Sequence, residues 1–139
     1  MSGFQEIAAI IGIAELSFRS ISSLYDFVSG LKYVPKELER IQSETSILVQ
    51  SLSALEFLSS ADSDTHAIVE RVGLPRAVAN CGDACQTLHN ALAKWNKPGQ
   101  RSVASKVQYR LHRKTIDAVL AQISFAKQTT ILCVVITQL

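Results

Sequence analysis

The sequence predicts an all-α protein: an up-down four-helix bundle with a short extra helix between the second and third long helices and a kinked or broken last helix. Apolar residues recur at alternating steps of three and four along four long segments, which is the pattern of helices with one buried stripe. The 139 residues include only 6 glycines and 3 prolines, whereas a β-sandwich needs a turn roughly every 8–12 residues. Four such stripes can be buried only against one another, so we expect one domain spanning residues 1–139.

The first predicted helix covers about residues 4–29, and Gly30 is its expected stop. Between residues 7 and 14, further apolar residues lie outside its stripe, so this part is apolar nearly all round. Such a helix needs either deep burial or a second apolar surface. The predicted stripe is Phe4, Ile7, Ile11, Ala14, Phe18, Ile21, Tyr25 and Val28.

The second predicted helix begins at Val34-Pro35 and extends to about Leu58. Proline fits the first position of a helix, and the acidic Glu37 and Glu39 favour the positive end of the helix dipole. The predicted stripe is Val34, Leu38, Ile41, Thr45, Leu48, Leu52 and Leu55.

Polar residues 59–65 form the clearest loop. At its end, Asp64 or Thr65 can cap a short helix that extends to about Val72 and is ended by Gly73. The third long helix is predicted over residues 74–95, and a break follows it. Its stripe is Leu74, Val78, Cys81, Cys85, Leu88, Leu92 and Trp95.

The last segment begins near Ser102, and its apolar stripe changes phase near Arg113, which predicts a kink or break there. Residues 129–137 are rich in β-branched side chains, which suit a strand, but no second strand is available to pair with them. We therefore predict a helix to the end of this segment.

Charge is distributed unevenly along the chain. Residues 1–70 carry 4 basic and 10 acidic side chains, whereas residues 71–139 carry 10 basic and 2 acidic ones. A solvated face is the simplest interpretation of such a run, and the alternative is a surface for anionic lipid or an acidic partner. Nucleic acid is not expected, because no reader motif accompanies the charges. The candidate residues are Lys97, Arg101, Lys106, Arg110, Arg113 and Lys114.

The apolar start of the first helix has two compatible interpretations: a helix packed in the bundle, and a segment that is released into a membrane. About 13 residues of helix span roughly 20 Å, which is enough to enter one leaflet. No unbroken run reaches the roughly 18 apolar residues of a spanning helix. The candidate membrane-insertion residues are Phe4, Ile7, Ile10, Ile11, Ile13 and Leu16.

Catalytic and metal chemistry have little support in the sequence. Cys81, Cys85 and His89 lie at successive i, i+4 positions, but the outer two are about 12 Å apart along a helix, too far to share one ion. Both cysteines occupy predicted core positions. His66 and His112 belong to other segments, and no nucleophile or phosphate-loop motif occurs. We therefore expect no enzyme activity, no catalytic residues, no metal and no cofactor. Three cysteines and no secretory signal favour a cytoplasmic location.

Three blocks carry a family resemblance: GFQEIAAIIGIAELSFRSISSLYDFVSGLKYVPKEL, VGLPRAVANCGDACQTLHNALAKW and HRKTIDAVLAQISFAKQTTILCVVITQL. Together they resemble the HeLo-like N-terminal domain of fungal NOD-like receptors. The resemblance implies a helical bundle that acts as a cell-death effector in immunity or incompatibility. It also implies that this domain belongs to a longer protein with nucleotide-binding and repeat domains, whose assembly activates it.

On this basis we expect a non-enzymatic signalling domain that forms homo-oligomers, moves from the cytoplasm to the plasma membrane and permeabilises it through its first helix. Anionic membrane lipids are the expected partners. A regulatory or scaffolding bundle that binds proteins and has no membrane activity is the alternative.

Overall fold

The computed structural model describes residues 15–32, 34, 36–55, 63–95 and 112–137. The all-α prediction is confirmed for these residues, which form five helices and no strand. The helices are α2 (Glu15–Ser29), α3 (Lys36–Ser53), α4 (Ser63–Val72), α5 (Leu74–Trp95) and α7 (Arg113–Thr137).

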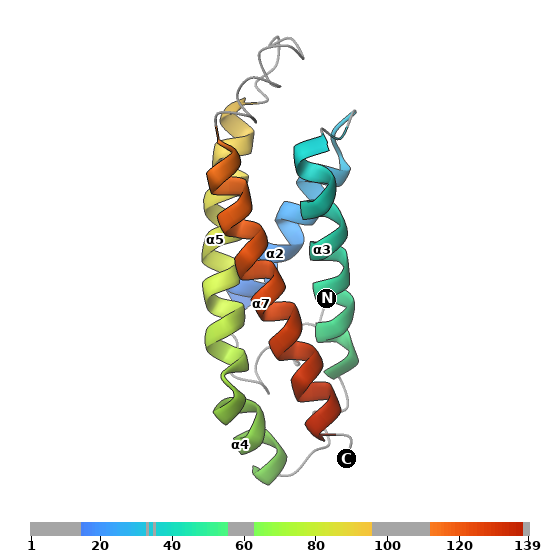
Figure 1. Cartoon of the computed structure of the whole chain (residues 1–139), viewed down its shortest axis with the longest axis vertical. Helices are drawn as coiled ribbons and strands as arrows, with labels where there is room; N and C mark the ends of the chain where they lie inside the picture. Colours follow the sequence, from blue (N-terminus) through green and yellow to red (C-terminus); the bar gives the residue numbers. More distant parts are fainter. Residues whose placement is uncertain (1–14, 33, 35, 56–62, 96–111, 138–139) are drawn as a thin grey trace.

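The four long helices surround one core (Figure 1). α2 and α7 each pack against both α3 and α5, and α4 packs against α5 and α7. In Figure 1, α2 and α5 run toward one end of the molecule, whereas α3 and α7 run toward the other. α3 and α7 therefore begin at the same end. The up-down connectivity of a complete four-helix bundle stays a prediction, because the chain between α5 and α7 lies outside the described residues.

The predicted stripe of α3 is buried from Leu38 to Leu55, whereas Val34 before it is only partly buried. The stripe of α2 differs at one position, because Leu24 is fully buried and Tyr25 is only partly so. α2 contacts α3 on one side and α5 on the other, and its buried face includes Ser17 and Ser20 as well. The buried face of α2 is therefore wider than the single stripe that was predicted for it.

A glycine sets the separation of α2 and α5. A Cβ added to Gly82 would lie 2.7 Å from both the Cα and the Cβ of Ser17. Contacts this short do not occur between real atoms, so only glycine permits the observed approach of the two helices. Beside this contact, Ser20 Oγ lies 3.1 Å from Gln86 Oε1.

The short helix predicted before the third long helix is present as α4. It ends at Gly73, whose φ of 88° lies in the left-handed region that favours glycine. The Gly73 amide donates a hydrogen bond to the Glu70 carbonyl at 3.0 Å. α5 begins at the next residue, so the two helices are joined by a single turn residue.

α7 is helical to Thr137, which confirms a helix rather than a strand over its β-branched end. The hydroxyls of Thr129 and Thr130 donate to carbonyl oxygens four residues earlier, at 2.8 and 2.7 Å, so their burial leaves no hydroxyl unpaired. The described helix begins at Arg113, where a kink or break was predicted. The basic part that precedes it lies outside the described residues.

An ion pair joins α7 to α3. Lys127 Nζ donates to Glu44 Oε2 at 2.6 Å, and the two side chains are only 22% and 17% exposed. This contact favours one axial register of α7 along α3.

Candidate functional site

Of the six predicted membrane-insertion residues, the structure describes only Leu16. Its side chain is 71% exposed in the first turn of α2. The other five, Phe4, Ile7, Ile10, Ile11 and Ile13, lie outside the described residues, so their proposed role stays a prediction.

Of the six predicted basic residues, Arg113 and Lys114 are described, and both are exposed in the first turn of α7. Arg113 Nε lies 3.9 Å from Asp117 Oδ2, and these side chains are 79% and 62% exposed. A pair so long and so well solvated contributes little energy, so it does not tie up the guanidinium. Lys97, Arg101, Lys106 and Arg110 lie outside the described residues.

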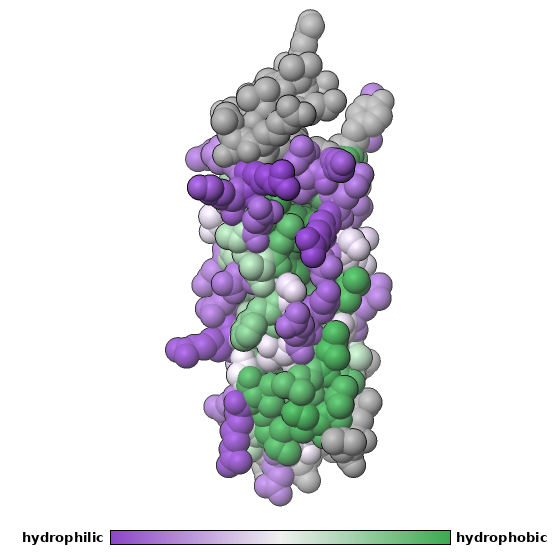
Figure 2. Space-filling model, viewed as in Figure 1, coloured by the Kyte–Doolittle hydropathy of each residue, from purple (hydrophilic) through white to green (hydrophobic). Residues whose placement is uncertain are grey.

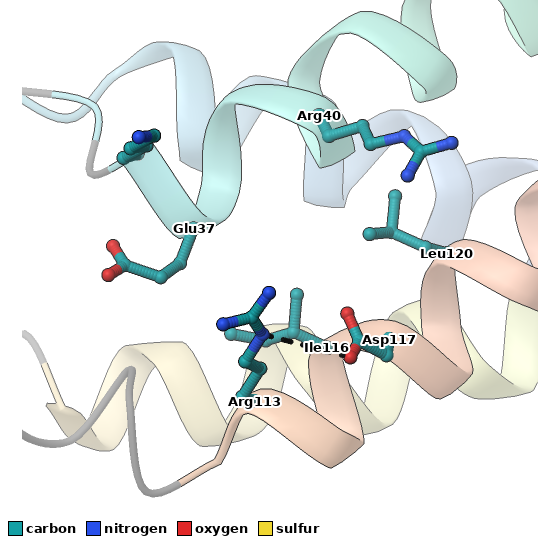
Figure 3. Close-up of a pocket in the computed structure, with 7 residues that line it drawn as sticks. Glu37, Arg40, Arg113, Ile116, Asp117 and Leu120 are labelled. Carbon is teal, nitrogen blue, oxygen red and sulfur yellow. Dashed lines mark ion pairs between the residues drawn. The ribbon is translucent and has the colours of Figure 1, made fainter.

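Arg113 lines a surface hollow of about 420 Å³ between the beginnings of α3 and α7 (Figure 3). Figure 3 shows its guanidinium and that of Arg40 reaching into this space from the two helices, while the Glu37 carboxylate extends away from both. The lining residues are Lys36, Glu37, Arg40, Arg113, Ile116, Asp117 and Leu120.

Sequence reasoning missed two of the three cations in this hollow. Lys36 and Arg40 lie in the acidic half of the chain, where the charge count gave no sign of a basic site. Among the described residues, neither forms an ion pair. Their i, i+4 spacing places both on one face of α3, but only the parallel packing of α3 and α7 brings that face to Arg113.

A second surface lies on α7, opposite its buried stripe. Figure 2 shows hydrophilic residues over the end where α3 and α7 begin and apolar residues over the carboxyl-terminal half of α7. Phe125, Leu132 and Val135 are 58%, 48% and 53% exposed. Large apolar side chains that share one exposed face indicate a contact surface.

The exposed face of α7 has a regular spacing. Its residues recur at steps of four and three, so they share one line along the helix. We call this line the outer stripe of α7. It consists of Lys114, Ala118, Ala121, Phe125, Gln128, Leu132 and Val135, all of them exposed.

Among the described helices, α7 is the one long and apolar enough to cross a membrane by length and composition. A core helix can meet the same criterion, but only 33% of the apolar window of α7 is buried. The search for an unbroken apolar run missed it, because Asp117 and Lys127 interrupt the helix.

Cys81 and Cys85 belong to the core, whereas His89 is only partly buried. Cys81 and Cys85 are fully buried with their sulfurs 4.0 Å apart, and the ring of His89 packs against Phe27 at a centroid distance of 4.9 Å. The hydrogen bond to Cys85, together with burial, raises the pKa of the Cys81 thiol, which keeps it protonated at neutral pH. No group of three His, Cys, Asp or Glu side chains within the described ranges has a geometry that could hold a metal ion.

The sequence model of one protein family, described as pigment biosynthesis cluster protein PigL N-terminal, matches residues 5–136. No curated protein and no solved structure matches the chain.

Proposed function

The chain belongs to the PigL N-terminal family, and from this premise we propose that it is a non-enzymatic helical signalling domain that acts at the surface of an anionic membrane. The family is related to HeLo-like domains, so the proposal includes the role of a cell-death effector in a fungal NOD-like receptor. The nucleotide-binding and repeat domains of such a receptor would control it.

The outer stripe of α7 carries the proposal. A helix that lies in the plane of a bilayer buries an apolar face about 5–10 Å into the boundary between headgroups and acyl chains. Phe125, Leu132 and Val135 supply such a face at one end of the stripe. Arg113 and Lys114 supply positive charge at the other end, at about 1 kcal/mol of attraction per basic residue near an anionic surface.

The N-terminal segment acts in a second step of this proposal. Once α7 has brought the domain to the plasma membrane from the cytoplasm, residues 4–16 enter one leaflet. Glu6 and Glu15 are costly in hydrocarbon, which favours shallow insertion within a homo-oligomer that shields them. The exposed Leu16 is the described residue that supports this step.

The spacing of the outer stripe also supports a second candidate function, a scaffold that binds another helix. Steps of four and three form a coiled-coil seam, and Ala118 and Ala121 would permit close approach of a partner. In this case the stripe binds protein, and the domain has no affinity for lipid.

Vesicle flotation separates these two functions. The purified domain is mixed with vesicles of phosphatidylcholine alone and with vesicles that contain phosphatidylserine, and dye release is recorded on the same samples. The membrane proposal predicts binding to the anionic vesicles that weakens as salt is raised. A folded domain that binds neither kind of vesicle would refute it and favour the scaffold.

Variants then assign each step to its surface. Leu132→Glu with Val135→Glu should abolish flotation, whereas Asn80→Glu with Thr87→Glu adds the same charge to exposed residues of α5 and should leave it intact. Phe4→Glu with Ile11→Glu should abolish dye release but retain flotation. Circular dichroism verifies that each variant is folded. Release that persists in the Phe4 and Ile11 variant would remove the insertion step from the proposal.

A further inference from the structure

The hollow between α3 and α7 has the composition of an anion site. Three cationic side chains, Lys36, Arg40 and Arg113, outnumber the two carboxylates in the lining, which are those of Glu37 and of Asp117 beside Arg113. We propose that the hollow binds a phosphate monoester, supplied by the headgroup of a membrane lipid. The lipid source rests on the proposed function, whereas the phosphate chemistry rests on the hollow alone.

The cations of the hollow come from two helices that are far apart in the chain. Arg40 comes from α3 and Arg113 from α7, and Figure 3 shows both guanidinium groups extending into the space between the helices. A guanidinium donates two parallel hydrogen bonds to phosphate oxygens, and two guanidinium groups are matched by the three free oxygens of a monoester. A diester has two such oxygens and less charge, so the hollow favours the monoester.

The backbone adds to the positive electrostatic potential of the hollow. α3 begins at Lys36 and α7 at Arg113, so the positive ends of both helix dipoles border the same hollow. These dipoles assist a ligand that the side chains bind; alone they would not define a site.

The remainder of the lining suits a lipid. Ile116 and Leu120 give the hollow an apolar floor beneath the cations. The volume of about 420 Å³ lies within the range of small-molecule pockets. The hollow also adjoins Lys114, the first residue of the outer stripe of α7, so a membrane in contact with that stripe would present its headgroups there.

The test compares two lipids at equal surface charge. Flotation is measured with phosphatidylcholine vesicles that contain phosphatidic acid, a monoester, and with vesicles whose phosphatidylserine content is adjusted to the same zeta potential. Calorimetric titration with glycerol 3-phosphate, the soluble headgroup of phosphatidic acid, tests the same chemistry without a bilayer. We expect about tenfold tighter binding to the phosphatidic acid vesicles.

Variants assign this preference to the hollow. Arg40→Gln with Arg113→Gln should remove the tenfold preference, whereas Arg71→Gln with Arg76→Gln removes equal charge from exposed residues outside the hollow and should preserve it. Asp117→Asn should strengthen binding about threefold, because it removes a negative charge from the lining of the hollow.

The outcomes separate the hollow from the membrane function. Binding of glycerol 3-phosphate without a preference among vesicles supports the site and gives it a soluble ligand. Equal binding to both lipids and no binding of glycerol 3-phosphate would overturn the inference while the membrane proposal stands. A preference that survives in the Arg40 and Arg113 variant would overturn the assignment to this hollow. Failure to bind any vesicle, with glycerol 3-phosphate still bound, would refute the proposed function and leave the phosphate site.

Discussion

Replacement of Gly82 by alanine tests whether the approach of α2 to α5 is set by this one residue. The added methyl group would lie 2.7 Å from the Cα and Cβ of Ser17 and 2.9 Å from its carbonyl oxygen. Ordinary contact begins at 3.4 Å, so the two helices must separate by about 0.7 Å. Two of the three atoms belong to the backbone, so no change of rotamer relieves the contact.

Two opposing effects determine the size of the loss. Overpacking a tight helix interface costs about 1–3 kcal/mol, and contact with backbone favours the upper end of that range. Alanine regains about 1 kcal/mol because it is a better helix former than glycine. We therefore expect Gly82→Ala to lower the free energy of unfolding by about 2 kcal/mol, and Gly82→Val to lower it further.

Urea denaturation followed by circular dichroism measures this loss. Asn80→Ala provides the matched control, because Asn80 is exposed on the same helix and its replacement changes helix propensity without crowding α2. The control should be neutral or slightly stabilising. If Gly82→Ala instead stabilises the protein by the full propensity gain of about 1 kcal/mol, then the close packing of α2 on α5 is wrong.

Two further predictions concern buried groups. Lys127→Ala should lower the free energy of unfolding by about 2 kcal/mol in urea denaturation, because it leaves the half-buried Glu44 carboxylate unpaired. The double variant Lys127→Met with Glu44→Leu should restore most of this loss. Equal losses in both variants would contradict the argument. The hydrogen bond to Cys85 and burial raise the pKa of the Cys81 thiol, and burial raises the pKa of the Cys133 thiol. The thiols of the unfolded chain ionise near their ordinary pKa of 9.0, whereas the folded thiols stay neutral. The free energy of unfolding should therefore be constant up to about pH 8 and fall as the pH rises past 9. Urea denaturation at pH 7 to 10 measures this fall, which should be shallower in Cys133→Ala; an unchanged slope in that variant would exclude the Cys133 thiol as a cause.

Sequence reasoning succeeded where a helix buries one face. α3 has one dominant apolar stripe, and the residues predicted from Leu38 to Leu55 are buried. It failed at Tyr25, because the buried face of α2 includes Ser17, Ser20 and Leu24 as well and is wider than a seam. A pattern of threes and fours gives the direction of a face but not its width.

The candidate sites were harder to predict. The outer stripe of α7 was visible in the sequence as a second line through Phe125, Leu132 and Val135, but a helix with two apolar lines has no single face that periodicity can select. The hollow left no local signal at all. Arg40 and Arg113 are brought together only by the packing of α3 beside α7, and nothing in the spacing of either segment indicates this neighbour.

The pairing of α3 with α7 also sets the order in which the protein acquires its surfaces during synthesis. Glu44 and Lys127 are 83 positions apart, and α7 is the last described helix to leave the ribosome. Until α7 docks, the nascent chain has no outer stripe and Arg40 has no opposing arginine. Any membrane affinity that depends on the outer stripe would therefore arise only after α7 has been synthesised and has docked on α3.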